Sequence, residues 1–207
     1  MGVGSKAPLA LDGAPADAAD AADAEGVVKR DKYHGQRDEE GNPHGKGRMK
    51  LANGDAYDGE WEAGQMHGHG THKWVSGAVY VGQWVAGVRE GAGKYSWDPK
   101  SPSQTTPASF EYEGEFHENL RSGKGVYRWG NGESYEGQVL NDQRHGVGRF
   151  RWHGGREDVC RFAEGRMVGE GVRWSPDRLK AWRTQDGDLM DEISLDEAMR
   201  LQESIEA

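Results

Sequence analysis

Three closely spaced histidines are the residues of this chain whose types and spacing best suit chemistry at a metal ion. His67, His69 and His72 form the segment His-x-His-x-x-His, and imidazole is a common zinc ligand. In an extended strand, however, residues an odd number of positions apart point to opposite faces, so the side chains of His69 and His72 would diverge. We therefore expect no metal site here and interpret His67 as a turn residue.

The motifs of common catalytic sites are missing from the sequence. No Gly-x-Ser-x-Gly nucleophile elbow occurs, and no glycine-rich loop runs into Lys-Ser or Lys-Thr as a phosphate-binding loop would. Cys160 is the single cysteine, and no neighbouring feature of the sequence activates it. We expect no catalytic residue, no cofactor and no enzyme activity.

The composition suits a protein of short strands and tight turns. Hydrophobic residues make up 34% of the chain, which nevertheless contains 32 glycines, eight tryptophans and seven tyrosines. A single cysteine excludes an intramolecular disulfide, and no apolar run resembles a signal peptide or reaches the length of a transmembrane helix. These features predict a cytoplasmic location.

The net charge of −9 is concentrated at the two ends of the chain. Residues 1–30 carry three basic and five acidic side chains, and residues 186–207 carry one and eight. The region 31–185 is left with 22 of each sign and is neutral. A neutral central region argues against nucleic acid as a partner.

The sequence from residue 33 onward repeats itself about every 23 residues. The openings are YHGQRDEEGNPHGKG, YDGEWEAGQMHGHG, YVGQWVAGVREGAG, YEGEFHENLRSGKG and YEGQVLNDQRHGVG, beginning at Tyr33, Tyr57, Tyr80, Tyr112 and Tyr135. A degenerate sixth unit, DVCRFAEGRMVGEG, begins at Asp158. A fixed period of this length is typical of a repeat protein.

Each repeat predicts a β-hairpin. In the second repeat Tyr57, Gly59 and Trp61 alternate with polar residues, and Gly70, His72 and Trp74 do so again after a turn. The aromatic residues of all repeats should share one face, as a structural core or as a protein-binding surface. They are Tyr33, Tyr57, Trp61, Trp74, Tyr80, Trp84, Trp97, Tyr112, Phe116, Trp129, Tyr135 and Trp152.

The two faces of the predicted sheet should differ in character. On the aromatic face, the repeated glycines should leave room for a ring from a neighbouring hairpin. On the opposite face, the first strand of a repeat carries acids such as Asp58 and Glu113, and the second strand carries bases such as Arg48 and Lys94. We expect these charges to pair across strands and to fix the register.

The segments around the repeats have different compositions. Residues 1–30 are rich in alanine and aspartate and predict a flexible tail, and residues 98–109 predict an inserted surface loop. Ser101 and Thr106 in this loop each precede a proline, a pattern that suits either a phosphoregulated loop or simple solvation of the loop. About six repeats fill residues 31–178. Residues 179–207 predict a terminal hairpin and then a helix that begins at a capping box, Ser194 to Glu197. Leu195, Met199 and Ile205 lie on its apolar stripe, which either covers the last hairpin or docks a partner.

The repeats resemble the membrane occupation and recognition nexus (MORN) repeat, whose pattern is roughly Y-x-G-x-W-x-x-G-x-x-H-G-x-G. The second repeat, 57–70, matches every one of these positions, whereas the sixth has Asp158 and Cys160 in place of Tyr and Gly and its Trp174 stands one position early. The resemblance implies an all-β fold, an elongated twisted array of antiparallel β-hairpin repeats, here with a short C-terminal α-helix. We interpret the sixth repeat as a terminal capping repeat.

The resemblance also bears on function. It implies a non-catalytic scaffold that binds one or more protein partners in the cytoplasm, in a cilium or flagellum or in another cytoskeletal assembly. Two alternatives are a peripheral membrane module that binds acidic phospholipids and a regulatory accessory subunit of an enzyme. The paired charges provide no uncompensated basic patch for lipid. The sequence alone does not identify the partner or the oligomeric state.

Overall fold

The computed structural model describes residues 32–98 and 109–207 and is built from antiparallel strands with one helix at the C-terminal end. The described residues up to Leu120 form one compact unit and those from Arg121 onward form another. The first unit contains β1 (Lys32–Arg37), β2 (Pro43–Lys50), β3 (Ala56–Glu62), β4 (Gln65–Lys73), β5 (Val79–Val85), β6 (Val88–Trp97) and β7 (Phe110–His117). The second contains β8 (Leu120–Trp129), β9 (Ser134–Leu140), β10 (Gln143–Arg151), β11 (Glu157–Ala163), β12 (Arg166–Trp174), β13 (Ala181–Gln185), β14 (Asp188–Ile193) and α1 (Leu195–Glu206).

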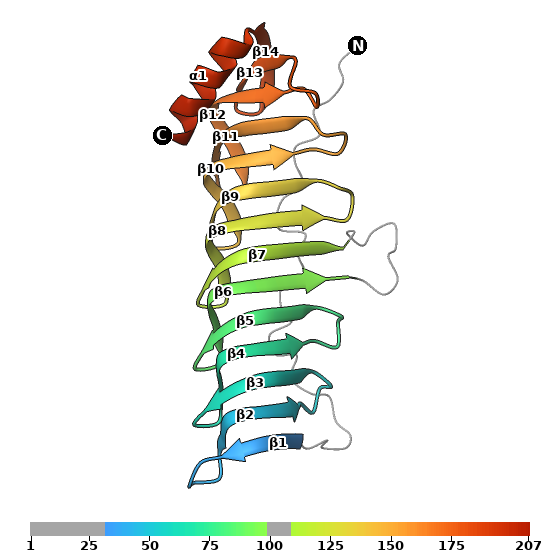
Figure 1. Ribbon diagram of the computed structural model, residues 1–207, viewed down its shortest axis with the longest axis vertical. Helices are drawn as coiled ribbons and strands as arrows, with labels where there is room; N and C mark the ends of the chain where they lie inside the picture. The colour runs from blue at the N-terminus through green and yellow to red at the C-terminus, as the bar shows by residue number, and fades with distance from the viewer. Residues whose placement is uncertain (1–31, 99–108) are drawn as a thin grey trace. The chain divides into compact units, whose positions relative to one another are not determined.

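Within each unit the strands lie side by side in sequence order, which confirms the predicted array of antiparallel hairpins and the C-terminal helix (Figure 1). In repeats after the first, the two strands are joined by two-residue turns in which both residues have positive φ. Examples of these turns are Ala63–Gly64, Ala86–Gly87 and Asn141–Asp142. Such turns match the right-handed twist of a hairpin. The predicted tail, 1–30, and the predicted loop with Ser101 and Thr106 lie outside the described residues.

In the first, second, third and fifth repeats the repeated glycines meet as a pair across the hairpin, and the tyrosine of the same repeat covers them. Gly59 faces Gly70, and a Cβ atom added to Gly59 would lie 2.5 Å from the Cα of Gly70 and 2.6 Å from the hydroxyl of Tyr57. The ring nearest to the glycines is thus that of the same repeat, and a neighbouring hairpin's ring also reaches a glycine backbone, since the indole N–H of Trp61 donates to the carbonyl oxygen of Gly47 at 3.0 Å. The space is filled locally because the tyrosine two residues before the glycine folds over its own strand pair.

The tyrosine hydroxyl also holds the backbone where each hairpin changes register. Tyr80 donates a hydrogen bond to the carbonyl oxygen of Gln83 at 3.0 Å, beside the register shift between Gly82 and Trp84. Burial raises the pKa of Tyr80 to about 12, which keeps the hydroxyl protonated and able to donate at neutral pH. The equivalent bonds in other repeats are Tyr33 to Gln36, Tyr57 to Glu60, Tyr112 to Glu115 and Tyr135 to Gln138.

Removing one of these hydroxyls should have a modest, measurable effect. Tyr80→Phe is expected to lower the free energy of unfolding by about 1 kcal/mol, because it leaves the Gln83 carbonyl without this donor. Tyr33→Phe is the matched control, because its bond to Gln36 lies in an exposed strand where water replaces the donor. Urea denaturation of both variants tests the prediction, and an equal or larger loss for Tyr33→Phe would contradict it.

The rings themselves form the core of the repeats. The ring of Tyr80 lies edge-on to Trp84 of its own repeat, with centroids 5.1 Å apart, and to Phe116 of the next repeat at 5.0 Å. Edge-to-face pairs of this kind stabilise beyond the area they bury. Rings of consecutive hairpins thus contact one another directly, as those of Tyr80 and Phe116 do.

The opposite face carries the paired charges that the sequence predicts. Arg48 lies opposite Asp58, Lys94 opposite Glu113, and Arg149 opposite Glu136. Lys94 forms an ion pair with Glu111 at 2.9 Å and Arg149 with Glu206 at 3.1 Å, and partly exposed ion pairs of this kind contribute little stability each. The main effect of the facing charges is on the register of the strands. A shift of one strand by one residue would move its charged side chains to the aromatic face and its rings to the charged face.

Two buried arginines form a feature that the sequence analysis missed. Arg89 and Arg144 stand nine residues after the repeat tyrosine, and Arg144 is fully buried. Its guanidinium lies 5.1 Å from the centre of the Phe162 ring and donates to the carbonyl oxygen of Gly165 at 2.6 Å. Arg89 donates to the carbonyl oxygen of Asn119 at 2.7 Å in the same way. Each arginine therefore ties its own repeat to the turn of the next one.

The character of the charged face changes in the last repeat. Val159, Val172 and Trp174 occupy the positions that Glu136, Arg149 and Arg151 hold in the repeat before. The face is apolar here, and α1 covers it by packing on β11, β12 and β13. The resulting core contains Val159, Val172, Trp174, Ala181, Ile193, Ala198 and Ile205.

The helix begins as predicted. The hydroxyl of Ser194 accepts from the backbone N–H of Glu197 at 3.2 Å, and Ile193 and Ala198 are both buried, as a hydrophobic staple requires. The side chain of Glu197 pairs with Arg183 on β13. That ion pair ties the first turn of α1 to the sheet.

Candidate docking site beside the C-terminal helix

The apolar stripe of α1 divides into a buried part and an exposed part. Ala198 and Ile205 face the core, whereas Leu195 is 39% exposed and Met199 is 50% exposed. Of the three residues predicted as a docking surface, Leu195 and Met199 are thus accessible, and Ile205 is enclosed. The helix both covers the last hairpin and presents apolar side chains to solvent.

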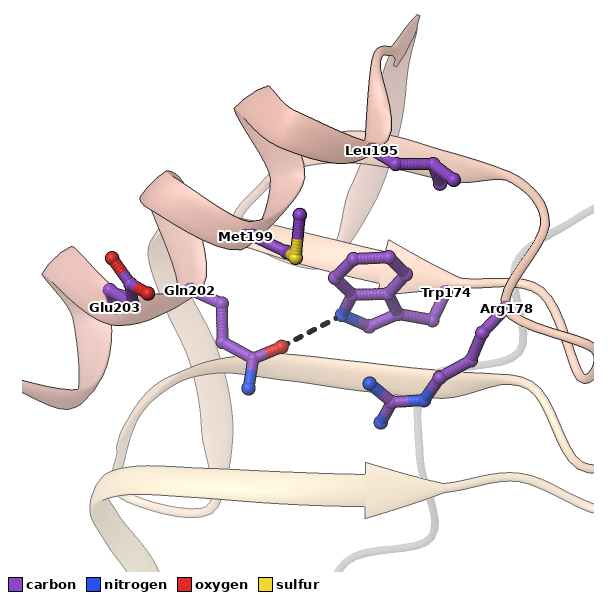
Figure 2. A pocket seen from close by; sticks show the side chains of 6 residues that line it. All are labelled: Trp174, Arg178, Leu195, Met199, Gln202 and Glu203. Carbon is purple, nitrogen blue, oxygen red and sulfur yellow. Dashed lines mark hydrogen bonds between the residues drawn. The ribbon is translucent and has the colours of Figure 1, made fainter.

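Leu195 and Met199 line a shallow groove between α1 and the end of β12. Its volume is about 340 Å³, and its lining is completed by Trp174, Arg178, Gln202 and Glu203. Figure 2 shows the indole of Trp174 between the helix and the guanidinium of Arg178, with Met199 above it. We call these six residues the α1 groove.

Polar contacts fix the floor and walls of the α1 groove. The indole N–H of Trp174 donates to the side-chain oxygen of Gln202 at 3.0 Å (Figure 2). The guanidinium of Arg178 lies 5.1 Å from the centre of the Trp174 ring and pairs with the buried carboxylate of Glu157. The groove is therefore preformed, which reduces the entropy lost when a ligand binds.

The electrostatic setting of the α1 groove is acidic. Residues 186–207 carry eight acidic side chains and one basic one. Glu203 lies in the groove, and Glu206 of the same helix pairs with Arg149 at 3.1 Å. An apolar segment with basic flanks would complement this region.

A second hollow lies beside the same strands. It has a volume of about 400 Å³, and its lining includes Arg156, Arg173, Trp182 and Leu189. Arg173 already forms a two-point ion pair with the buried carboxylate of Asp158, and the guanidinium of Arg156 stacks 4.3 Å from the centre of the Trp152 ring. Both cations already have partners, as Arg178 of the α1 groove does.

The predicted aromatic face is mostly interior. Tyr57, Trp61, Tyr80, Trp84, Trp97, Tyr112, Phe116 and Tyr135 are buried, and Tyr33, Trp74, Trp129 and Trp152 are half-buried. The rings of the first set contact other rings of the core, as Tyr57 contacts Trp61 and Trp84. A protein-binding role for the half-buried set stays a prediction.

The three histidines separate in the structure. His72 is buried and its ring lies 4.2 Å from that of Trp74, while His67 contacts Glu62 at 3.1 Å. No group of three or more potential metal ligands occurs within residues 32–98 and 109–207. Burial also raises the pKa of the Cys160 thiol to about 12, so this thiol is a poor nucleophile at neutral pH. Among the described helices none is long and apolar enough to cross a membrane.

Leu195 and Met199 are the two residues of the α1 groove that were predicted from the sequence. Trp174, Arg178, Gln202 and Glu203 were not predicted as site residues. A signal was available for Trp174, because its one-position displacement within the repeat moves its side chain to the opposite face of the strand. That face is the one that α1 covers.

The architecture, then, is that of a hairpin-repeat protein, and the comparison with protein families agrees. The MORN repeat model matches six segments, 39–56, 57–79, 80–100, 112–134, 135–155 and 161–180. The chain belongs to the MORN repeat family.

The other comparisons add little. No curated protein matches the chain significantly. A solved structure of the TCP domain of SAS-4 (dCPAP) of Drosophila melanogaster, in complex with a proline-rich motif of Ana2 (dSTIL), is similar at 9% identity with a TM-score of 0.40. The similarity covers 84% of this chain and 96% of that one. A TM-score of this size supports no inference about this chain.

Proposed function

We propose that this chain is a non-catalytic MORN-repeat scaffold that binds a protein partner at the α1 groove. The observation that carries the proposal is the exposure of Leu195 and Met199 beside an indole that is held in place by Gln202. Neighbouring apolar side chains on a rigid helix are typical anchors for a partner segment. The acidic charge of residues 186–207 favours a segment with basic flanks.

The expected setting is the cytoplasm, in a ciliary, flagellar or other cytoskeletal assembly. This expectation rests on the resemblance of the repeats to those of other scaffolds. It does not rest on any contact in the described part of the chain. The lipid alternative is less well supported, because bases of the charged face lie opposite acids, as Arg48 does opposite Asp58.

The double variant Leu195→Glu, Met199→Glu tests the proposal. Affinity capture is carried out with the full chain and with the double variant as bait, and the partner is the protein that the unmodified chain captures in a one-to-one ratio. We expect the double variant to recover at least about tenfold less of this protein, because two carboxylates would lie in an apolar contact. Leu140→Glu is the matched control, since Leu140 is 48% exposed and lies on β9, away from the helix. The control should capture the partner as the unmodified chain does.

Two outcomes would contradict the proposal. One is equal capture by the double variant and the control. The other is binding to vesicles of acidic phospholipid, lost on addition of salt, with no protein captured. Deletion of residues 194–207 is unsuitable as a test, because Ala198 and Ile205 close the core and their loss would unfold the last repeat.

A further inference from the structure

The two outermost strands of the described chain each have an edge without a neighbouring strand. β1 is hydrogen-bonded to β2 and β14 to β13, and both stand at an end of the strand order. In β14 the five residues before Ile193 are exposed, and in β1 all residues except Tyr33 are exposed. The helix packs on β11, β12 and β13 and leaves these five residues open. Such edges are ready to pair with a further strand.

The two edges carry opposite charges. β14 has Asp188, Asp191 and Glu192 and no basic residue. β1 contains Lys32, His34 and Arg37 and no acidic residue. Charged edge strands prevent sheets from joining at random, and here two β14 edges would repel each other, as would two β1 edges. A β14 edge and a β1 edge, in contrast, attract.

We infer that β14 of one copy pairs antiparallel with β1 of a second copy, so that the chain associates head to tail. The junction would repeat one that the chain already contains. β14 is the second strand of its hairpin and β1 is the first strand of its own, and second and first strands already pair between repeats at β2–β3, β4–β5 and β12–β13.

The internal register fixes which residues would meet. Trp182 faces Arg173 on one side and Glu192 on the other, and repeat tyrosines such as Tyr80 and Tyr135 lie at the corresponding position of the first strand. Continuing this row places Tyr33 of the second copy opposite Glu192. Asp188 then lies opposite Arg37, a pair of opposite charge, and Asp191 lies opposite His34.

The junction would also cover exposed apolar surface. Leu189 is 51% exposed and Met190 is 59% exposed, both in the middle of β14. In the same register Met190 lies opposite Gly35 of the second copy, which has no side chain to obstruct it. Burial of these two side chains adds a hydrophobic contribution to the backbone hydrogen bonds.

Sedimentation velocity of the full chain tests the inference. We expect the mean mass to rise with protein concentration over a range of about 1 to 300 μM, and to rise less at about 500 mM salt than at about 50 mM, because screening weakens the edge charges. A single monomeric species at every concentration and in low salt would overturn the inference.

Charge reversal of each edge identifies the surfaces. One variant combines Asp188→Lys with Asp191→Lys, and the other combines Lys32→Glu with Arg37→Glu. These positions are exposed, so both variants should fold. Each variant alone should associate at least about tenfold more weakly than the unmodified chain, and an equimolar mixture of the two should regain association because unlike edges are again available.

Persistent association of either variant alone, or a mixture that stays monomeric, would overturn the inference. It is independent of the proposed function, because the double variant Leu195→Glu, Met199→Glu leaves both edges intact. That variant should self-associate as the unmodified chain does, and a loss of self-association in it would assign the contact to the α1 groove and overturn the inference.

Discussion

Gly70→Val is expected to lower the free energy of unfolding by about 3 kcal/mol, at the upper end of the range for overpacked cores. Gly70 faces Gly59, and the Tyr57 ring lies against both. A valine side chain would displace this ring, and with it the edge-to-face contacts that Tyr57 makes with Trp61 and Trp84 at 5.0 and 5.5 Å. Urea denaturation followed by tryptophan fluorescence measures the loss.

Thr71→Val is the matched control for this prediction. It places valine one position later, where Thr71 is half-buried on the opposite face of β4. Its expected change is below about 1 kcal/mol. If Gly70→Val were no more destabilising than Thr71→Val, the tyrosine would not be the reason for glycine in these repeats.

Arg144→Ala is expected to cost about 3 kcal/mol or more. The substitution removes the hydrogen bond to the Gly165 carbonyl and leaves a cavity between Phe150 and Phe162. Thermal or urea denaturation of the variant measures the effect.

Arg144→Met separates the contribution of side-chain packing from that of the charge and its hydrogen bond. Met66 and Met167 stand at the same position of other repeats, and Met167 is 8% exposed. A methionine can therefore fill this space, and we expect Arg144→Met to cost less than half as much as Arg144→Ala. If both variants lost the same stability, the hydrogen bond to Gly165 and not the packing would explain the arginine.

The hairpins were predictable because the signals for them are local. The alternation of Tyr57, Gly59 and Trp61 with polar residues indicates a strand directly, and the same alternation recurs about every 23 residues. Charge pairs such as Arg48 with Asp58 were predictable for the same reason, since register follows from which face is apolar.

The missed features depend on contacts between segments. In the sequence, Arg144 resembles an exposed residue near a turn. It is buried because its guanidinium lies against three rings that belong to two repeats. The tyrosine that folds over the glycine pair of its own hairpin was not predicted, because alternation gives the face of a ring but not its direction along the strand. The α1 groove depends on Trp174, whose displacement by one position was visible but whose partner, Gln202, was not.

Hydrogen–deuterium exchange of the chain with and without its captured partner tests the central claim most directly. The account predicts slower exchange in the partner complex at the exposed side of α1, from Leu195 to Gln202, and at the turn that carries Arg178, with Leu140 and its strand unchanged. Slower exchange confined to β2 to β7, with α1 unaffected, would contradict the account and place the binding surface on the repeats themselves.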